Sequence, residues 1–423
     1  MKIAITIVRT TFAVVASALV LSCGGGGKSN STNDASGSGS TAAKRDVNIS
    51  CGAGAGEATL DATTTPGFVT ATATLTGNQQ SPPVCTGAKG TGTLTVDTTT
   101  GNITGSITLD SISNVTMAHI HDAEANDAII VPLVQNGSNP LRWDVQSPNN
   151  TLSPDQITHF NNGSLYFNAH TTANSKGEVR GQIGRSIFTA VLTSAQERLS
   201  DPSAAASTAT GTGKVVLDPS ANTMTATFTV TGLSGASTAA HIHTGAVGAA
   251  PGPVTFSMDE TSAGSGVFTT AQPLDAQQLS DLRAGNMYFN VHTDNNPNGE
   301  IRGQIGRVVR VAQPFGGAAQ VPAVKSRGSG SGFAVLDIVA RSFNGSMTIK
   351  DITPTMSHIH EGATGVNGSI VVNFTPPTST TPTATSQLVN ATVVKEFLDD
   401  ATYMNAHTAA NTGGEIRGQL DIP

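Results

Sequence analysis

Nine of the ten histidines in this chain occur in two short patterns that repeat three times. The first pattern is His-x-His, in "AHIHDAE", "AHIHTGA" and "SHIHEGA", and the second ends in Asn-x-His, in "YFNAH", "YFNVH" and "YMNAH". Neutral imidazole binds copper and zinc well, and three such ligands leave one coordination position open. Each repeat therefore offers three candidate metal ligands: His119, His121 and His170; His241, His243 and His292; His358, His360 and His407.

Strands of a β-sheet would position these side chains. Residues i and i+2 of a strand share a face, so His241 and His243 point to one side of their strand and Ile242 to the other. The third histidine must then come from a neighbouring strand. The same rule places a glutamate and an arginine on one face of the segment that follows it. We expect this polar row to be structural and to lie close to the histidines: Glu178 and Arg180, Glu300 and Arg302, Glu415 and Arg417.

Two interpretations of the histidines remain open. They can bind copper or zinc, or they can form a hydrogen-bonded clamp that fixes the register of the strands. The first repeat departs from the others, because "DAEANDAIIV" follows His121 where the other repeats have a glycine-rich loop. We expect its site to be altered, with Asp122 and Glu124 as additional oxygen ligands, and the sites of the second and third repeats to be best formed.

The repeat has the length of a domain. His121, His243 and His360 are 122 and 117 residues apart, which exceeds the period of solenoid repeats. Within the second repeat, "TMTATFTVT" alternates apolar residues with threonine, the pattern of a strand with one buried face. We therefore predict an all-β chain of three antiparallel sandwich or barrel domains, each with one short helix, over residues 52–186, 187–308 and 309–423.

The paired motifs "AHIHTGAVGAAPGPV" and "YFNVHTDNNPNGEIRGQ" resemble the CHRD domain, named for its occurrence in chordin and found in bacterial exported proteins. The resemblance covers all three repeats and implies a fold rather than a defined activity. The His-x-His strand with a distant third histidine also resembles the copper site of Cu/Zn superoxide dismutase, a β-sandwich. That enzyme's bridging histidine and zinc loop have no counterpart here, so the resemblance does not imply dismutase activity.

The N-terminus resembles that of a bacterial lipoprotein. Lys2 and Arg9 precede the apolar run "TFAVVASALVLS", which is too short to span a membrane, and Cys23 follows it. The resemblance implies a signal peptide over residues 1–22, a lipid on Cys23, a flexible tether over residues 23–51 and a place at the outer membrane or cell surface. Cys51 and Cys85 remain, and in an exported chain this even number predicts a disulfide between them, with two unpaired thiols as the alternative.

Composition narrows the function. Only 12% of residues are charged, the net charge is −7, and no basic stripe stands out, so nucleic acid is not an expected partner. We find no nucleophile elbow, phosphate loop or paired carboxylates. We therefore expect a non-enzymatic, membrane-anchored protein whose three domains serve binding or structural roles, with a polysaccharide, a protein or a metal as ligand. The alternative is a copper or zinc protein with redox activity at the three-histidine sites.

Overall fold

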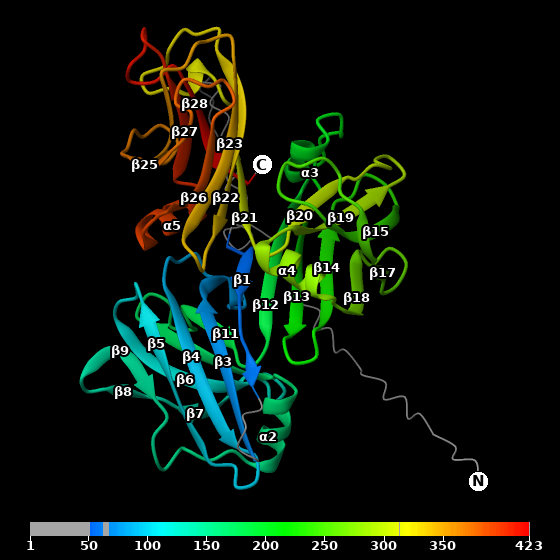
Figure 1. Ribbon diagram of the computed structural model, residues 1–423, viewed down its shortest axis with the longest axis vertical. Helices are drawn as coiled ribbons and strands as arrows, with labels where there is room; N and C mark the ends of the chain where they lie inside the picture. Colours follow the sequence, from blue (N-terminus) through cyan, green and yellow to red (C-terminus); the bar gives the residue numbers. More distant parts are fainter. Residues whose placement is uncertain (1–50, 62–66, 313, 423) are drawn as a thin grey trace, which may run out of the picture. The chain divides into compact units, whose positions relative to one another are not determined.

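The computed structural model describes residues 51–61, 67–312 and 314–422 (Figure 1). The predicted signal peptide, the predicted lipid attachment site Cys23 and the predicted tether up to residue 50 lie outside these residues. The described chain folds into three antiparallel sheets and four short α-helices, which confirms the all-β prediction. We call the parts that carry the three sheets domains 1, 2 and 3.

The sheet of domain 1 includes β2 (Leu60–Asp61), which pairs with β3. The other strands, in the order in which they lie side by side, are β7 (Ala128–Pro132), β6 (Val115–Asp122), β10 (Leu165–Thr171), β11 (Val179–Gln182), β3 (Phe68–Thr76), β4 (Lys89–Asp97), β5 (Ile103–Asp110), β9 (Asn139–Asp144) and β8 (Val134–Asn136).

Domain 2 repeats this order. Its strands are β16 (Val254–Ser257), β15 (Ser237–Thr244), β19 (Met287–Thr293), β20 (Ile301–Gln304), β12 (Ser186–Thr193), β13 (Thr210–Asp218), β14 (Thr223–Thr231), β18 (Val267–Pro273) and β17 (Asp259–Glu260). In domain 3 the order is β25 (Ile370–Asn373), β24 (Met356–Glu361), β27 (Thr402–His407), β28 (Ile416–Asp421), β21 (Val308–Ala312), β22 (Ser329–Asp337), β23 (Ser342–Lys350) and β26 (Thr383–Leu388).

Each sheet curls around its own apolar core. In β14 every second residue is buried, and Phe228 packs against Phe268 and Phe289 with ring centroids 4.9 and 5.1 Å apart. This alternation confirms the period-two pattern of the sequence. In domain 3 the two ends of the sheet approach each other, because the backbone N–H of Asn373 on β25 donates to Oε1 of Gln387 on β26 at 3.0 Å. The sheets are therefore nearly closed.

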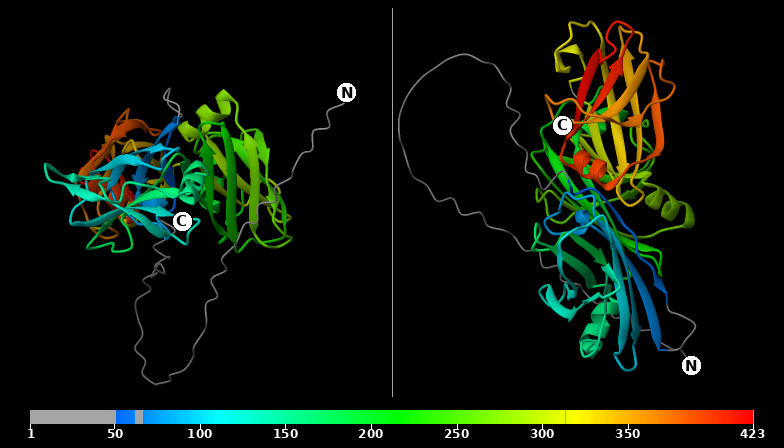
Figure 2. Two further views of the ribbon diagram at one scale, coloured as in Figure 1. Left: turned by 90° about the horizontal axis from the view of Figure 1, so that it is seen from below. Right: turned by 90° about the vertical axis from the view of Figure 1, so that its left-hand side faces the viewer.

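One short helix precedes the last two strands of each domain. These helices are α2 (Pro154–Asn161), α4 (Ala276–Ala284) and α5 (Ala391–Leu398), and Figure 2 (right) shows α5 at one end of the orange sheet. The Ser153 side chain caps α2 in a capping box with Gln156, as its sequence predicts. No helix in the described ranges combines the length and the apolar character that crossing a membrane requires.

Domain 2 has an additional helix, α3 (Ser194–Ser200), where domains 1 and 3 have the 3-10 turns η1 (Gly77–Gln79) and η2 (Gly317–Ala319). The Thr193 side chain accepts a hydrogen bond from the backbone N–H of Gln196, and the residues that follow are good helix formers. The cap and these propensities together account for the additional helix.

The disulfide between Cys51 and Cys85 is formed, with Cα atoms 5.0 Å apart. The strand that follows Cys51, β1 (Gly54–Gly56), pairs with β12 and so belongs to the sheet of domain 2. The sequence analysis assigned this segment to the first repeat. Its small residues carry no apolar pattern that would have indicated the correct sheet.

Candidate metal centre

The two histidine patterns of each domain lie on neighbouring antiparallel strands. The pairs are β6 and β10 in domain 1, β15 and β19 in domain 2, and β24 and β27 in domain 3. The first histidine of each His-x-His lies directly opposite an asparagine, as His241 does opposite Asn290. Residues opposite each other share a face, so the third histidine, two residues after that asparagine, lies on the face of the other two.

The three histidines converge in every domain. In each set of three, which we call a His trio, one ring nitrogen from every histidine lies within 4.8 Å of the others. The histidines of domains 1 and 3 are 5–7% exposed, whereas in domain 2 only His243, at 7%, is fully buried and the other two are partly exposed. The sequence predicts an altered first site, but the trio of domain 1 is as enclosed as that of domain 3.

Backbone carbonyls fix the orientation of two rings in each trio. Nδ1 of His243 lies 2.9 Å from the Gly252 carbonyl oxygen, and Nδ1 of His292 lies 3.0 Å from that of Pro297. A carbonyl only accepts, so both Nδ1 atoms carry the proton and both Nε2 atoms keep a lone pair. The equivalent contacts elsewhere are His121 to Asp127, His170 to Ser175, His360 to Gly368 and His407 to Thr412, at 2.8–3.0 Å.

The nitrogens on the other side of these rings have no hydrogen-bond partner. They are the buried Nε2 atoms of His121, His243, His292, His360 and His407, together with Nδ1 of His241 and His358. In domain 1, His119 Nδ1 instead lies 3.2 Å from His170 Nε2. Each trio thus presents one Nδ1 and two Nε2 atoms to a common point, two of them with their tautomer already set.

The environment favours the neutral form of seven of these rings. Burial lowers the pKa of His119 and of His358 to about 4, and the neighbouring histidines contribute to this shift. Burial also lowers the pKa of the following histidines: His121, His170, His241, His243 and His360. Metal ions bind the neutral form of imidazole, so the environment of these seven rings favours the form that a metal would bind.

A tyrosine and an arginine support the second histidine of each trio. His243 stacks on Tyr288 with ring centroids 5.0 Å apart, and Arg302 Cζ lies 3.3 Å from the centre of the same ring. Because β15 and β20 flank β19 on opposite sides, the imidazole and the guanidinium lie on the two faces of the phenol ring. The stack recurs as His121, Tyr166 and Arg180 in domain 1 and as His360, Tyr403 and Arg417 in domain 3.

The tyrosines are not among the site residues predicted from the sequence. The signal for them was present, since the chain has only 3 tyrosines and all occupy this position of the repeat. A guanidinium over an aromatic ring is worth about 0.5–2 kcal/mol, more when the pair is desolvated. The stack therefore holds the imidazole ring in place through packing as well as through its hydrogen bond.

The same groups hold the loop after His-x-His in domain 2. Arg302 donates to the Ala246 carbonyl oxygen at 2.8 Å, and the Gly252 N–H donates to the Tyr288 hydroxyl oxygen at 3.1 Å. Only glycine fits at position 252, because a Cβ atom there would lie 1.7 Å from the Thr244 carbonyl oxygen. The glycine-rich loop thus places a backbone carbonyl against His243 and adds no side chain to the trio.

The arginines and the glutamates of the predicted polar row have different roles. The arginines lie on the histidine face, as described. Glu300 instead accepts hydrogen bonds from the hydroxyls of Ser207, Ser234 and Thr293 at 2.6–2.8 Å and ties together the loops at one end of domain 2. Glu178 and Glu415 accept equivalent bonds from threonine and serine hydroxyls in domains 1 and 3.

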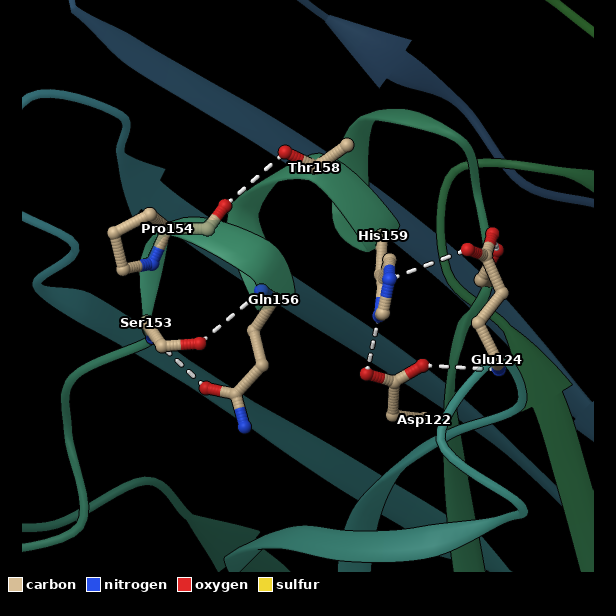
Figure 3. Close-up of polar contacts among 8 residues, drawn as sticks. Asp122, Glu124, Ser153, Pro154, Gln156, Thr158 and His159 are labelled. Carbon is tan, nitrogen blue, oxygen red and sulfur yellow. Dashed lines mark hydrogen bonds and ion pairs between the residues drawn. The ribbon is translucent and has the colours of Figure 1, made fainter.

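Asp122 and Glu124 bind the tenth histidine rather than the trio of domain 1 (Figure 3). His159 on α2 places Nδ1 2.7 Å from an oxygen of Asp122 and Nε2 3.2 Å from an oxygen of Glu124. The hydrogen bond to Asp122 raises the pKa of His159. The suggestion that these carboxylates add oxygen ligands is therefore wrong, because both bond to the ring of His159 instead.

Asp127 takes over the role of the glycine-rich loop in domain 1. Its carbonyl oxygen lies 2.8 Å from His121 Nδ1. Its carboxylate oxygen Oδ1 accepts a hydrogen bond from the Tyr166 hydroxyl at 2.9 Å. The backbone of Asp127 has φ +57°, a conformation that aspartate tolerates better than most residues. A different loop sequence therefore delivers the same backbone carbonyl to the same ring.

A second polar group adjoins each trio. The asparagine opposite the first histidine contacts Gln80 in domain 1 and Gln320 in domain 3, at 2.8 and 2.7 Å. In domain 2, α3 places Glu197 at this position, and the Asn290 amide donates to it at 2.9 Å. Burial raises the pKa of Glu197 to about 7, although the nearby Arg302 opposes the shift.

Comparison with known protein families agrees with the repeat. The CHRD domain matches the chain three times, over residues 71–183, 188–305 and 312–420. The chain belongs to the CHRD family. No match was found among curated proteins. Each of the three CHRD matches contains one complete His trio.

Proposed function

We propose that each CHRD domain of this chain binds one copper or zinc ion through its His trio. The observation that carries the proposal is the direction of the imidazole nitrogens. In domain 2, for example, His243 and His292 each donate from Nδ1 to a backbone carbonyl, while each Nε2 is buried without a partner. Histidines that ligate metals have this arrangement, with the second nitrogen held by a carbonyl or carboxylate.

A purely structural clamp accounts less well for this arrangement. A clamp stabilises strands by satisfying polar atoms, yet each trio of domains 2 and 3 buries three nitrogens without partners. Each such atom costs about 1–3 kcal/mol relative to a satisfied one. An ion bound by three neutral imidazoles would satisfy all three at once and would keep an open coordination position.

The donor set supports copper or zinc rather than magnesium or calcium, which prefer oxygen ligands. When bound, copper would supply one-electron chemistry and zinc would act as a Lewis acid. The chain's own residues do the rest: backbone carbonyls set the tautomers, and Tyr288 and Arg302 hold the ring of His243. We propose binding without catalysis as the role of these sites.

We further propose that the chain is an exported lipoprotein, anchored at the bacterial outer membrane or cell surface through Cys23. The leader, the apolar run and the polar segment over residues 23–51 support this, and so does the Cys51–Cys85 disulfide, since disulfides persist outside the reducing cytosol. The partners would be the membrane, through the lipid, and metal ions. Replacement of Cys23 by alanine should move the protein from the membrane to the soluble fraction.

Metal analysis of the exported protein, purified without chelators, tests the main proposal. We expect about three copper or zinc ions per chain. A triple variant with His170→Ala, His292→Ala and His407→Ala should contain almost none, while a His159→Ala control should keep all three. If the wild-type protein binds neither copper nor zinc on titration, the proposal is wrong.

A further inference from the structure

The His trios differ in how well they are covered. In domains 1 and 3 the first and third histidines are 5–7% exposed, whereas in domain 2 His241 and His292 are partly exposed. The backbone does not account for this, because the register between the two strands is the same at the His-x-His pattern. The difference must come from side chains around the trio.

The residue two positions before His-x-His also distinguishes domain 2 from domains 1 and 3. It is Met117 in domain 1 and Met356 in domain 3, but Ala239 in domain 2. Met117 lies directly opposite His170 and Met356 directly opposite His407. Residues opposite each other on antiparallel strands share a face, with Cβ atoms about 4.5–5.5 Å apart. Both methionines therefore lie on the face of the trio, next to its third histidine.

The apolar core does not hold these methionines. Met117 is 48% exposed and Met356 is 44% exposed, whereas the core methionine Met224 is 2% exposed. A methionine that stays exposed on a strand contributes little hydrophobic stabilisation. Its side chain has three rotatable bonds and a polarisable sulfur, so it can turn toward a neighbouring group. A thioether is a soft ligand that selects Cu(I) among the metals that imidazole binds.

We propose that Met117 and Met356 each add a thioether to the ion held by the His trio of their domain, which makes domains 1 and 3 Cu(I) sites. Ala239 leaves domain 2 with three imidazoles only, a set that suits Cu(II) or Zn(II). This inference rests on the proposed function. The chain would then have two classes of site, one that prefers Cu(I) and one that suits Cu(II) or Zn(II).

The experiment measures metal selectivity in the full exported chain. A Met117→Leu, Met356→Leu variant keeps the volume and apolar cover of methionine but removes the sulfur. We expect the ratio of Cu(I) to Zn(II) affinity at two sites to fall about 10- to 100-fold. Cu(I) affinity would be measured by anaerobic competition with a colorimetric chelator. Ala239→Met should raise the same ratio at the third site.

X-ray absorption of the Cu(I)-loaded protein gives an independent readout. We expect sulfur among the ligands of wild-type protein and nitrogen alone in the Met117→Leu, Met356→Leu variant. If wild-type protein binds metal through its histidines but shows no sulfur ligand, the methionines only cover the trio and this inference is wrong, while the proposed function stands. If the protein binds no metal at all, both fail.

Discussion

Domain 2 and its two neighbours share one sheet order and one His trio, but they differ at two positions beside that trio. Where domains 1 and 3 have a methionine opposite the third histidine and a glutamine against the asparagine, domain 2 has Ala239 and Glu197. The first replacement leaves the trio of domain 2 more exposed, and the second places a carboxyl group beside it. The histidines are thus constant and the side chains around them vary, as expected if the three sites differ in the ion that they prefer.

The largest expected effect comes from removing a ligand. His292→Ala in domain 2 and His407→Ala in domain 3 should each lower the metal content of the chain from about three ions to two, because two imidazoles hold an ion far more weakly than three. The free energy of unfolding of the metal-free protein should fall by only about 0.5–1.5 kcal/mol, for the lost bond to a backbone carbonyl.

Elemental analysis and chemical denaturation of the two variants check this prediction. A loss of more than about 3 kcal/mol with unchanged metal content would instead indicate a structural clamp. A different result for the two variants would mean that the domains do not share one mode of binding.

The next effect concerns the loop that fixes His243. Gly252→Ala should destabilise domain 2 by about 3 kcal/mol or more, because the new Cβ atom would lie 1.7 Å from a backbone oxygen that cannot move alone. Gly413→Ala is the matched control, since a Cβ atom there meets nothing within 4 Å. Hydrogen exchange of the β15 and β16 amides, compared with that of domain 3, measures the loss in each variant. Equal exchange in both variants would contradict the steric argument.

Acidification should destabilise domains 1 and 3 more than domain 2. His119 and His358 have a folded pKa of about 4, below their ordinary value of 6.5, so the folded state binds fewer protons than the unfolded state between these values. The stability they contribute is complete above about pH 6.5 and falls as the pH drops toward 4, by about 1–3 kcal/mol for each histidine. Urea unfolding of metal-free protein at several pH values, followed by exchange in each domain, should show domain 2 losing least.

The smallest expected effect concerns Glu197, whose contribution to the stability of domain 2 changes with pH in the opposite direction. The folded pKa of Glu197 is raised to about 7 from 4.5, so the folded state binds more protons and the stability that this proton contributes disappears as the pH rises through 7. Glu197→Gln should stabilise domain 2 by about 1–3 kcal/mol above pH 7 and have no effect below about pH 4.5. Gln320→Glu should transfer the same penalty to domain 3. A gain that does not change with pH would rule out this role for the carboxyl proton.

Much of the site could be predicted from period-two patterns. Alternation in β14 indicated the buried face, and the same rule placed His241 and His243 together. These predictions succeeded because a strand fixes the direction of each side chain from its position alone.

The remaining features depend on contacts between distant segments. The pairing of β1 with β12 joins residues more than 130 positions apart, and Gly54 to Gly56 carry no pattern that specifies it. Asp122 and Glu124 have the chemistry of metal ligands, but α2 places His159 beside them and both carboxylates bond to its ring. Glu197 became significant only because a helix replaces a turn at its position and buries it.

The carbonyl contacts of the His trios also determine how many protons metal binding releases. Since Nδ1 of His243 and His292 already carries its proton and the facing Nε2 is already bare, an ion can enter without displacing a proton from either ring. The heat of metal binding should therefore be the same in buffers of different ionisation enthalpy, in contrast to thiolate sites, which release protons on binding.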